Sequence, residues 1–112
     1  MRKVSALFLI VSSIVCAAPA AVPVAEIPTV LVFGDSLSAG YGIDVDQSWT
    51  SLLQARLDAQ GYEHRVVNAS ISGETTEGGA TRIETALENF APEVVVIALG
   101  GNDGLRWFPP AL

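Results

Sequence analysis

The chain is poor in several residue types that commonly carry chemistry. Among its 112 residues it has one cysteine, one histidine, and six basic residues against twelve acidic ones. Because nucleic-acid partners require clustered lysine and arginine, this charge balance argues against nucleic-acid binding. One histidine and scattered carboxylates offer no metal-ligand spacing, so we expect no metal and no cofactor. Half of the residues are hydrophobic and 16% are charged, which is typical of one globular domain.

Residues 1–20 have the features of a secretory signal peptide. Arg2 and Lys3 precede an apolar stretch, Val4 to Cys16, that is too short to span a bilayer comfortably, and Ala18-Pro19-Ala20 fits a small-x-small cleavage site. We predict cleavage after Ala20 and export to the periplasm or the exterior; an uncleaved N-terminal anchor is the alternative. Cleavage removes the only cysteine, which excludes a disulfide, a thiolate nucleophile and a cysteine-ligated metal from the exported part.

Beyond a proline-rich, flexible lead-in at residues 21–28, apolar strand patterns alternate with helical ones. Strands are predicted at residues 29–33, 65–69 and 93–99. A first helix runs from the N-cap Ser48 to a stop at Gly61, and a second spans 76–90. The expected inner faces of the two helices are Trp49, Leu52, Leu53 and Leu57, and Ala80, Ile83, Leu87 and Phe90.

This order predicts an α/β fold, a parallel sheet flanked by helices with right-handed crossovers. Ligands bind at the carboxyl ends of the strands in such open sheets. The polar loops that follow Phe33, Val67 and Leu99 should therefore gather on one edge of the sheet. Glu74 and Glu77 precede the second helix, where negative charge favours the helix dipole.

Each of the three loops offers one group suited to acyl-transfer chemistry. Ser36 is a candidate nucleophile, Gly73 lets a backbone N–H approach a ligand closely, and the Asn102 amide could donate a hydrogen bond to an oxyanion. Each feature alone is also an ordinary turn. We expect Asp35 to hold its turn by accepting backbone hydrogen bonds. Convergence of the three loops would give an oxyanion hole with three donors.

The wording of these loops, "GDSLSAGYG", "VVNASISGETT" and "LGGNDGLR", resembles the first three signature blocks of the SGNH, or GDSL-type, hydrolases, in their bacterial periplasmic thioesterase, lysophospholipase and arylesterase branch. The resemblance implies a flavodoxin-like SGNH fold, Ser36 as nucleophile, and an oxyanion hole formed by the Ser36 and Gly73 N–H groups and Asn102. It implies carboxylic ester or thioester substrates, often lipid acyl chains. The substrate-contacting residues we expect are Asp35, Leu37, Asp103 and Trp107.

The family's last block, an aspartate and a histidine three residues apart, has no counterpart before Leu112. We therefore expect residues 29–112 to be the N-terminal part of the hydrolase domain, ending after the third strand and inactive alone, with a monomeric full-length protein. His64 should lie about 15 Å from the reacting edge, at the start of the second strand, and so cannot replace the missing base. The alternatives are a non-catalytic module that binds an acyl or glycan ligand and, if the domain is complete, a carbohydrate O-acetyl esterase.

Overall fold

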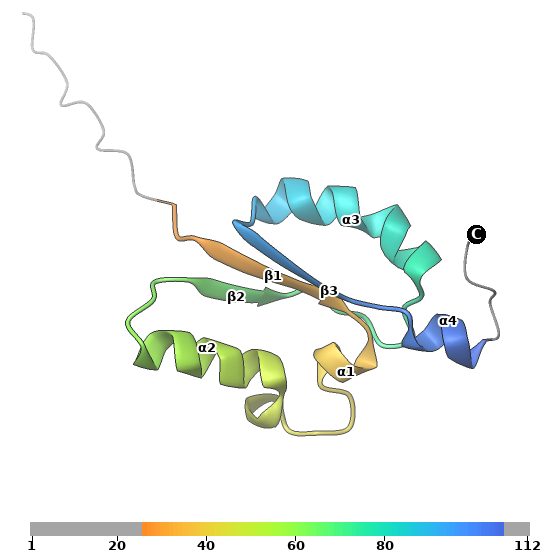
Figure 1. The fold of residues 1–112 in the computed structure, drawn as a ribbon, viewed down its shortest axis with the longest axis horizontal. Helices are drawn as coiled ribbons and strands as arrows, with labels where there is room; N and C mark the ends of the chain where they lie inside the picture. The colour runs from red at the N-terminus through yellow and green to blue at the C-terminus, as the bar shows by residue number, and fades with distance from the viewer. Residues whose placement is uncertain (1–25, 107–112) are drawn as a thin grey trace, which may run out of the picture.

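The computed structural model describes residues 26–106, in which three parallel strands form one sheet with helices on both faces (Figure 1). The strands are β1 (Thr29–Gly34), β2 (Arg65–Asn68) and β3 (Val94–Ala98), in the order β2-β1-β3. The predicted α/β architecture is confirmed. The predicted signal peptide, residues 21–25 of the lead-in and Trp107 lie outside the described residues.

The central strand β1 carries the core of the domain. All of its residues are buried, and Leu31 and Val32 have no exposed surface. Leu31 and Phe33 pack with Ala86 and with half-buried hydrophobic side chains that include Val67 and Ile83. A short β-branched run is well suited to this position, since a strand covered on both faces has no polar side to present.

Helix α2 (Trp49–Ala59) covers one face and begins as predicted, with Ser48 Oγ accepting the Ser51 N–H. Its predicted inner face is partly wrong. Leu52 is 57% exposed, whereas Thr50 is buried. Leu53 and Leu57 are half-buried, and the helix is also held by polar contacts, because Gln54 donates to the His64 carbonyl and accepts from the Val66 N–H at 2.7 Å.

Helix α3 (Thr76–Phe90) covers the opposite face and has the predicted bounds. It packs through Gly79, Ile83 and Ala86, whereas the other predicted inner-face residues, Ala80, Leu87 and Phe90, are exposed. A Cβ at Gly79 would lie 2.5 Å from Leu99 Cδ1 and 3.3 Å from Phe33 Cε1. Glycine at this position therefore lets the helix approach the sheet more closely than any other residue would, which shifts the packing face by one position.

Three short elements were not predicted: α1 (Ser36–Ala39), the 3₁₀ turn η1 (Val45–Gln47) and α4 (Gly101–Leu105). Both α1 and α4 begin in the loops at the carboxyl edge of the sheet, directly after β1 and soon after β3 (Figure 1). The first residue of α1 is Ser36, and the second of α4 is Asn102. The catalytic candidates of these two loops thus lie in the first turns of short helices.

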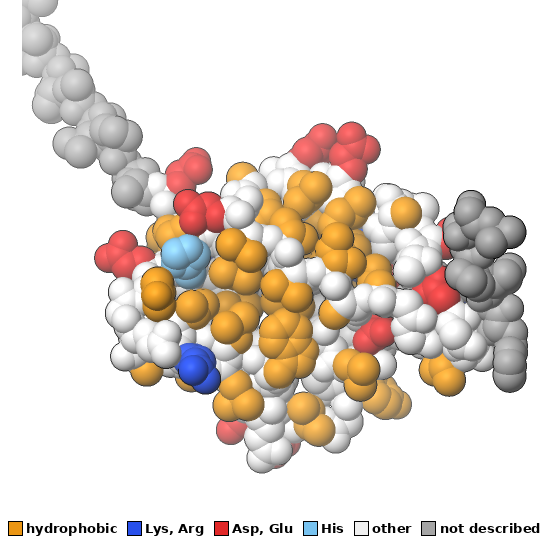
Figure 2. All heavy atoms as spheres, viewed as in Figure 1, with side chains coloured by type: hydrophobic (Ala, Val, Ile, Leu, Met, Phe, Trp, Pro, Cys, Tyr) orange, Lys and Arg blue, Asp and Glu red, His pale blue; other side chains and the backbone are white. Residues whose placement is uncertain are grey.

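Strand β3 leaves hydrophobic side chains open to solvent within the described part of the chain. Val94, Val95 and Ile97 are 47%, 36% and 64% exposed. Figure 2 shows hydrophobic side chains gathered over the face that β3 presents between α3 and α2. Parallel strands are normally covered on both faces, so this surface is unusually apolar for one in contact with water. Across residues 26–106, the structure contains no helix with the length and apolar character needed to cross a bilayer.

Candidate active site

The first loop turns sharply out of β1 and presents Ser36. A Cβ on Gly34 would lie 2.7 Å from Ser38 Oγ and 3.0 Å from the Ala98 carbonyl oxygen, so the sharp return of the chain requires glycine. Asp35 is buried, and its Oδ1 accepts the Leu37 N–H at 3.0 Å as the N-cap of α1. Ser36 follows this cap and is half-buried.

Helix α1 is too short to be stable alone, and it is anchored by side chains from neighbouring elements. The Ser38 carbonyl accepts from Asn68 Nδ2 at 2.7 Å, and the buried Ser38 Oγ accepts from Trp49 Nε1 at 3.3 Å. Asn68 and Ser38 were not singled out from the sequence. A polar residue that ends a strand next to the site, as Asn68 does, is the signal that could have found the first of them.

The second loop is a tight turn held against the end of β1. The Ile71 N–H donates to the Gly34 carbonyl at 3.0 Å, and the Glu74 N–H closes the turn on the Ile71 carbonyl at 3.2 Å. Gly73 lies at the third position of this turn with φ of 83°. A left-handed residue there favours glycine, so the turn explains Gly73 independently of any ligand.

The third loop is bonded to the second and lies close to the first. Asn102 Nδ2 donates to the Glu74 carbonyl at 2.9 Å. A Cβ placed on Gly101 would lie 3.5 Å from Asp35 Oδ2, which shows how closely this loop approaches the first. The loops that carry Ser36, Gly73 and Asn102 therefore meet at the carboxyl edge of the sheet, the second bonded to the end of β1 and to the third, and the third close to the first.

Donor groups remain available where these loops meet. Within residues 26–106, the backbone N–H groups of Ser36 and Gly73 have no hydrogen-bond acceptor, nor does the Ser36 hydroxyl have a partner. The Asn102 amide uses one N–H on Glu74 and has a second one to donate. A hydroxyl and three N–H donors carried by loops that meet at one edge are the groups needed to attack an acyl carbonyl and stabilise the resulting oxyanion.

The remaining sequence-predicted residues have different placements. Asp35 does not fit the role of a substrate contact, because its carboxylate is buried and already caps α1. Asp103 accepts hydrogen bonds from the Thr76 hydroxyl and N–H, and these bonds lower the pKa of its carboxyl group. Leu37 is 82% exposed beside Ser36, as a contact for an apolar substrate would be. Trp107 lies outside the described residues.

His64 lies at the opposite edge of the sheet. It precedes β2, and its Nε2 is 3.3 Å from Glu93 Oε2, just before β3. Backbone bonds from Arg65 and Glu93 to the start of β1 mark this as the amino edge. The placement agrees with the expectation that His64 does not activate Ser36, since proton abstraction requires contact within about 3 Å.

Comparison with known proteins bears on the same loops. Residues 32–112 match the GDSL-like Lipase/Acylhydrolase family. The chain belongs to this family. The GDSL-like chain is 57% identical to esterase TesA of Pseudomonas aeruginosa, over 74% of its own length and 41% of the relative's. It is 46% identical to thioesterase 1/protease 1/lysophospholipase L1 of Escherichia coli K12, over 73% of its length and 38% of the relative's.

A solved structure of a relative also supports the fold. The crystal structure of TesA superposes on the GDSL-like chain with a TM-score of 0.72 at 56% sequence identity, and covers 73% of this chain and 46% of that one. The chain thus spans about two fifths of the length of the curated relatives it matches. The family and the parallel-sheet fold are shown by these comparisons.

Proposed function

We propose that the complete product of this gene is a serine esterase or thioesterase that works through an acyl-enzyme on Ser36. In this mechanism Ser36 Oγ attacks the acyl carbonyl and its proton passes to a base. The oxyanion accepts hydrogen bonds from the N–H groups of Ser36 and Gly73 and from Asn102 Nδ2. The carbonyl re-forms as the alcohol or thiol leaves, and water then releases the acid.

The observation that carries this proposal is the mutual contact of the three loops. Ile71 reaches the Gly34 carbonyl from the second loop, and Asn102 reaches Glu74 from the third. The names of the relatives, esterase and thioesterase, support the class of bond that is cleaved. We propose that the substrates are carboxylic esters and thioesters with apolar acyl chains, for which the exposed Leu37 side chain is a suitable contact.

The base is the part of the machinery that the described residues do not supply. His64, the only histidine of the chain, lies at the far edge of the sheet. We propose that an aspartate and a histidine three residues apart follow position 112 in the complete gene product, and that residues 1–112 alone hydrolyse esters poorly. Removal of triad members still leaves binding and oxyanion stabilisation, so weak residual catalysis is expected.

Ser36→Ala tests the nucleophile directly. In the complete gene product it should abolish hydrolysis of an aryl ester and labelling by a fluorophosphonate, whose phosphorus is attacked by Ser36 Oγ with loss of fluoride. Ser51→Ala is the matched control, since Ser51 lies in α2 and bonds the Val45 carbonyl; it should keep both. Undiminished labelling of the Ser36→Ala protein would remove the assignment.

The nucleotide sequence after codon 112 separates this proposal from a non-catalytic acyl- or glycan-binding module. An Asp-x-x-His block downstream supports the enzyme, and an immediate stop in independent clones supports the binding module. We further propose export through residues 1–20 and a monomeric state for the complete protein. Mass spectrometry of the mature N-terminus and sedimentation analysis test these two points.

A further inference from the structure

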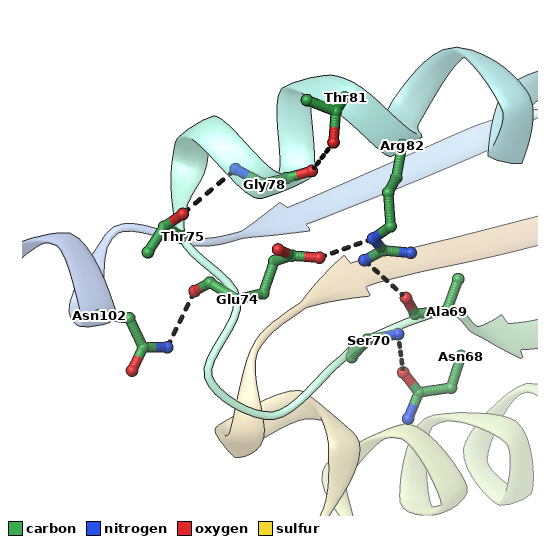
Figure 3. A network of polar contacts seen from close by, with 9 residues as sticks. All are labelled: Asn68, Ala69, Ser70, Glu74, Thr75, Gly78, Thr81, Arg82 and Asn102. Carbon is green, nitrogen blue, oxygen red and sulfur yellow. Dashed lines mark hydrogen bonds and ion pairs between the residues drawn. The ribbon is translucent and has the colours of Figure 1, made fainter.

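An ion pair fixes the second loop from the side of α3. Arg82 Nε lies 2.6 Å from Glu74 Oε2, and the Glu74 side chain is only 12% exposed. In Figure 3 the Arg82 side chain extends from α3 down to the loop, and the Glu74 carboxylate extends toward it. A charge pair that is this shielded from water is held more firmly than an exposed one, because solvent screens it less.

The guanidinium of Arg82 is held on two further sides. Its Cζ lies 4.5 Å from the centre of the Phe33 ring, in a cation–π arrangement, and Nη2 donates to the Ala69 carbonyl at 3.4 Å. Phe33 belongs to the core of β1, and Ala69 follows β2 directly. Arg82 therefore fixes the position of Glu74 relative to the buried centre of the sheet.

Glu74 is directly connected to two of the three proposed oxyanion donors. Gly73 precedes Glu74 in the turn. The Glu74 carbonyl accepts the hydrogen bond from Asn102 Nδ2 at 2.9 Å (Figure 3). The Glu74 carboxylate packs so tightly on the first turn of α3 that a side chain at Gly78 would overlap its Oε1. A movement of Glu74 would therefore displace the Gly73 N–H and the Asn102 amide together.

We infer that Arg82 is a positioning residue for the oxyanion hole, acting through Glu74. This inference rests on the proposed function. Arg82 contacts Glu74, Phe33 and Ala69 and not the Ser36 hydroxyl, and the proposed mechanism assigns it no contact with the substrate. It keeps two of the three donors at the spacing that the transition state requires, and oxyanion donors aimed in advance of the reaction are worth about 10²–10³-fold in kcat each.

The kinetic test compares Arg82→Ala, Arg82→Lys and Glu74→Gln in the complete gene product. Arg82→Ala should lower kcat for an aryl ester about 10- to 100-fold and change KM less than threefold, because the loss falls on the transition state. Arg82→Lys should recover part of kcat, since it keeps the charge but not the planar fork or the stacking. The double variant Arg82→Ala/Glu74→Gln should be no worse than Arg82→Ala, as the two residues act in series.

Gln54→Ala is the matched control for a merely structural role. Gln54 ties α2 to β2 with two hydrogen bonds and lies outside the oxyanion loops. Gln54→Ala should lower the melting temperature by about as much as Arg82→Ala does, while leaving kcat unchanged. Equal kcat values for Arg82→Ala and Gln54→Ala would overturn the inference.

A second measurement does not depend on activity. In ¹⁵N relaxation experiments the Gly73 and Glu74 amides should have order parameters near 0.85 in the unmodified protein and below about 0.6 in Arg82→Ala. If that variant does not fold, Glu74→Gln should show the same loss. A loop that stays rigid in the variants overturns the inference. Absence of Ser36-dependent hydrolysis in the unmodified protein overturns the proposed function instead, and loop order then decides the inference alone.

Discussion

Gly34, the last residue of β1, is packed so closely that alanine should not fit. Its added Cβ would lie 2.7 Å from Ser38 Oγ and 3.0 Å from the Ala98 carbonyl oxygen. Ser38 is buried and Ala98 is backbone of the paired strand β3, so neither can retreat without moving α1 or the sheet. Overpacking costs about 1–3 kcal/mol, and alanine regains about 0.5–1 kcal/mol over glycine in a strand. Since neither neighbour can retreat, the cost lies in the upper part of that range, and we expect Gly34→Ala to lower the free energy of unfolding by about 1–2 kcal/mol.

Urea unfolding of the complete gene product, followed by far-UV circular dichroism, measures this change. With a denaturant slope of about 2 kcal/mol per molar, the midpoint should fall by about 0.5–1 M. Gly104→Ala is the control, because its added Cβ meets no described atom within 4 Å apart from its chain neighbours and the backbone of its own helix; its midpoint should not fall. In a Ser38→Gly background the cost of Gly34→Ala should shrink. An unchanged midpoint for Gly34→Ala, or the same cost in both backgrounds, would refute the packing argument.

Two further predictions concern charge and the open strand. Because Thr76 lowers the pKa of Asp103, the ionised carboxylate stabilises the folded state at neutral pH. Thermal melts should show the unmodified protein to be more stable than Asp103→Asn at pH 7. The difference should vanish as the pH falls below 3.8, the ordinary value for the carboxyl group, and through the lower pKa of the folded state. A difference independent of pH would contradict this. Residues 21–112 alone should aggregate through β3, where Ile97 is 64% exposed. Ile97→Lys should reduce light scattering whereas Leu52→Lys should not, and equal scattering would exclude the β3 edge.

The elements that the sequence predicted are those that local chemistry specifies. The apolar run of β1, the Ser48 cap and the spacing of α3 each depend on neighbouring residues only, and each appears within one or two residues of its predicted bounds. The place where the three loops meet also follows from pattern, because parallel strands bring their carboxyl ends to one edge. Ser36, Gly73 and Asn102 could therefore be assigned to one edge without coordinates.

The features that escaped prediction depend on contacts between distant residues. Helix α1 has four residues and depends on Asn68, which is thirty positions away in the chain. Glu74 precedes α3, where a helix-dipole role suffices to explain it, yet it pairs with Arg82. Likewise, the inner face of α3 includes Gly79, which no hydrophobicity pattern marks. In each case the decisive partner is identified by packing rather than by spacing.

The central place of β1 has a consequence for how the protein is made. Thr29 pairs with Arg65 and Val30 with Val94, so the first of the described strands to be synthesised has both of its partners far downstream. At about 5–20 residues per second, the ribosome takes several seconds to deliver them. During that interval the most deeply buried strand of the described sheet stays unpaired, and distant pairing of this kind is slow to form. Of the described strands, the one that leads into Ser36 thus waits longest for its partners, and it is the one that a chaperone would have to shield during biosynthesis.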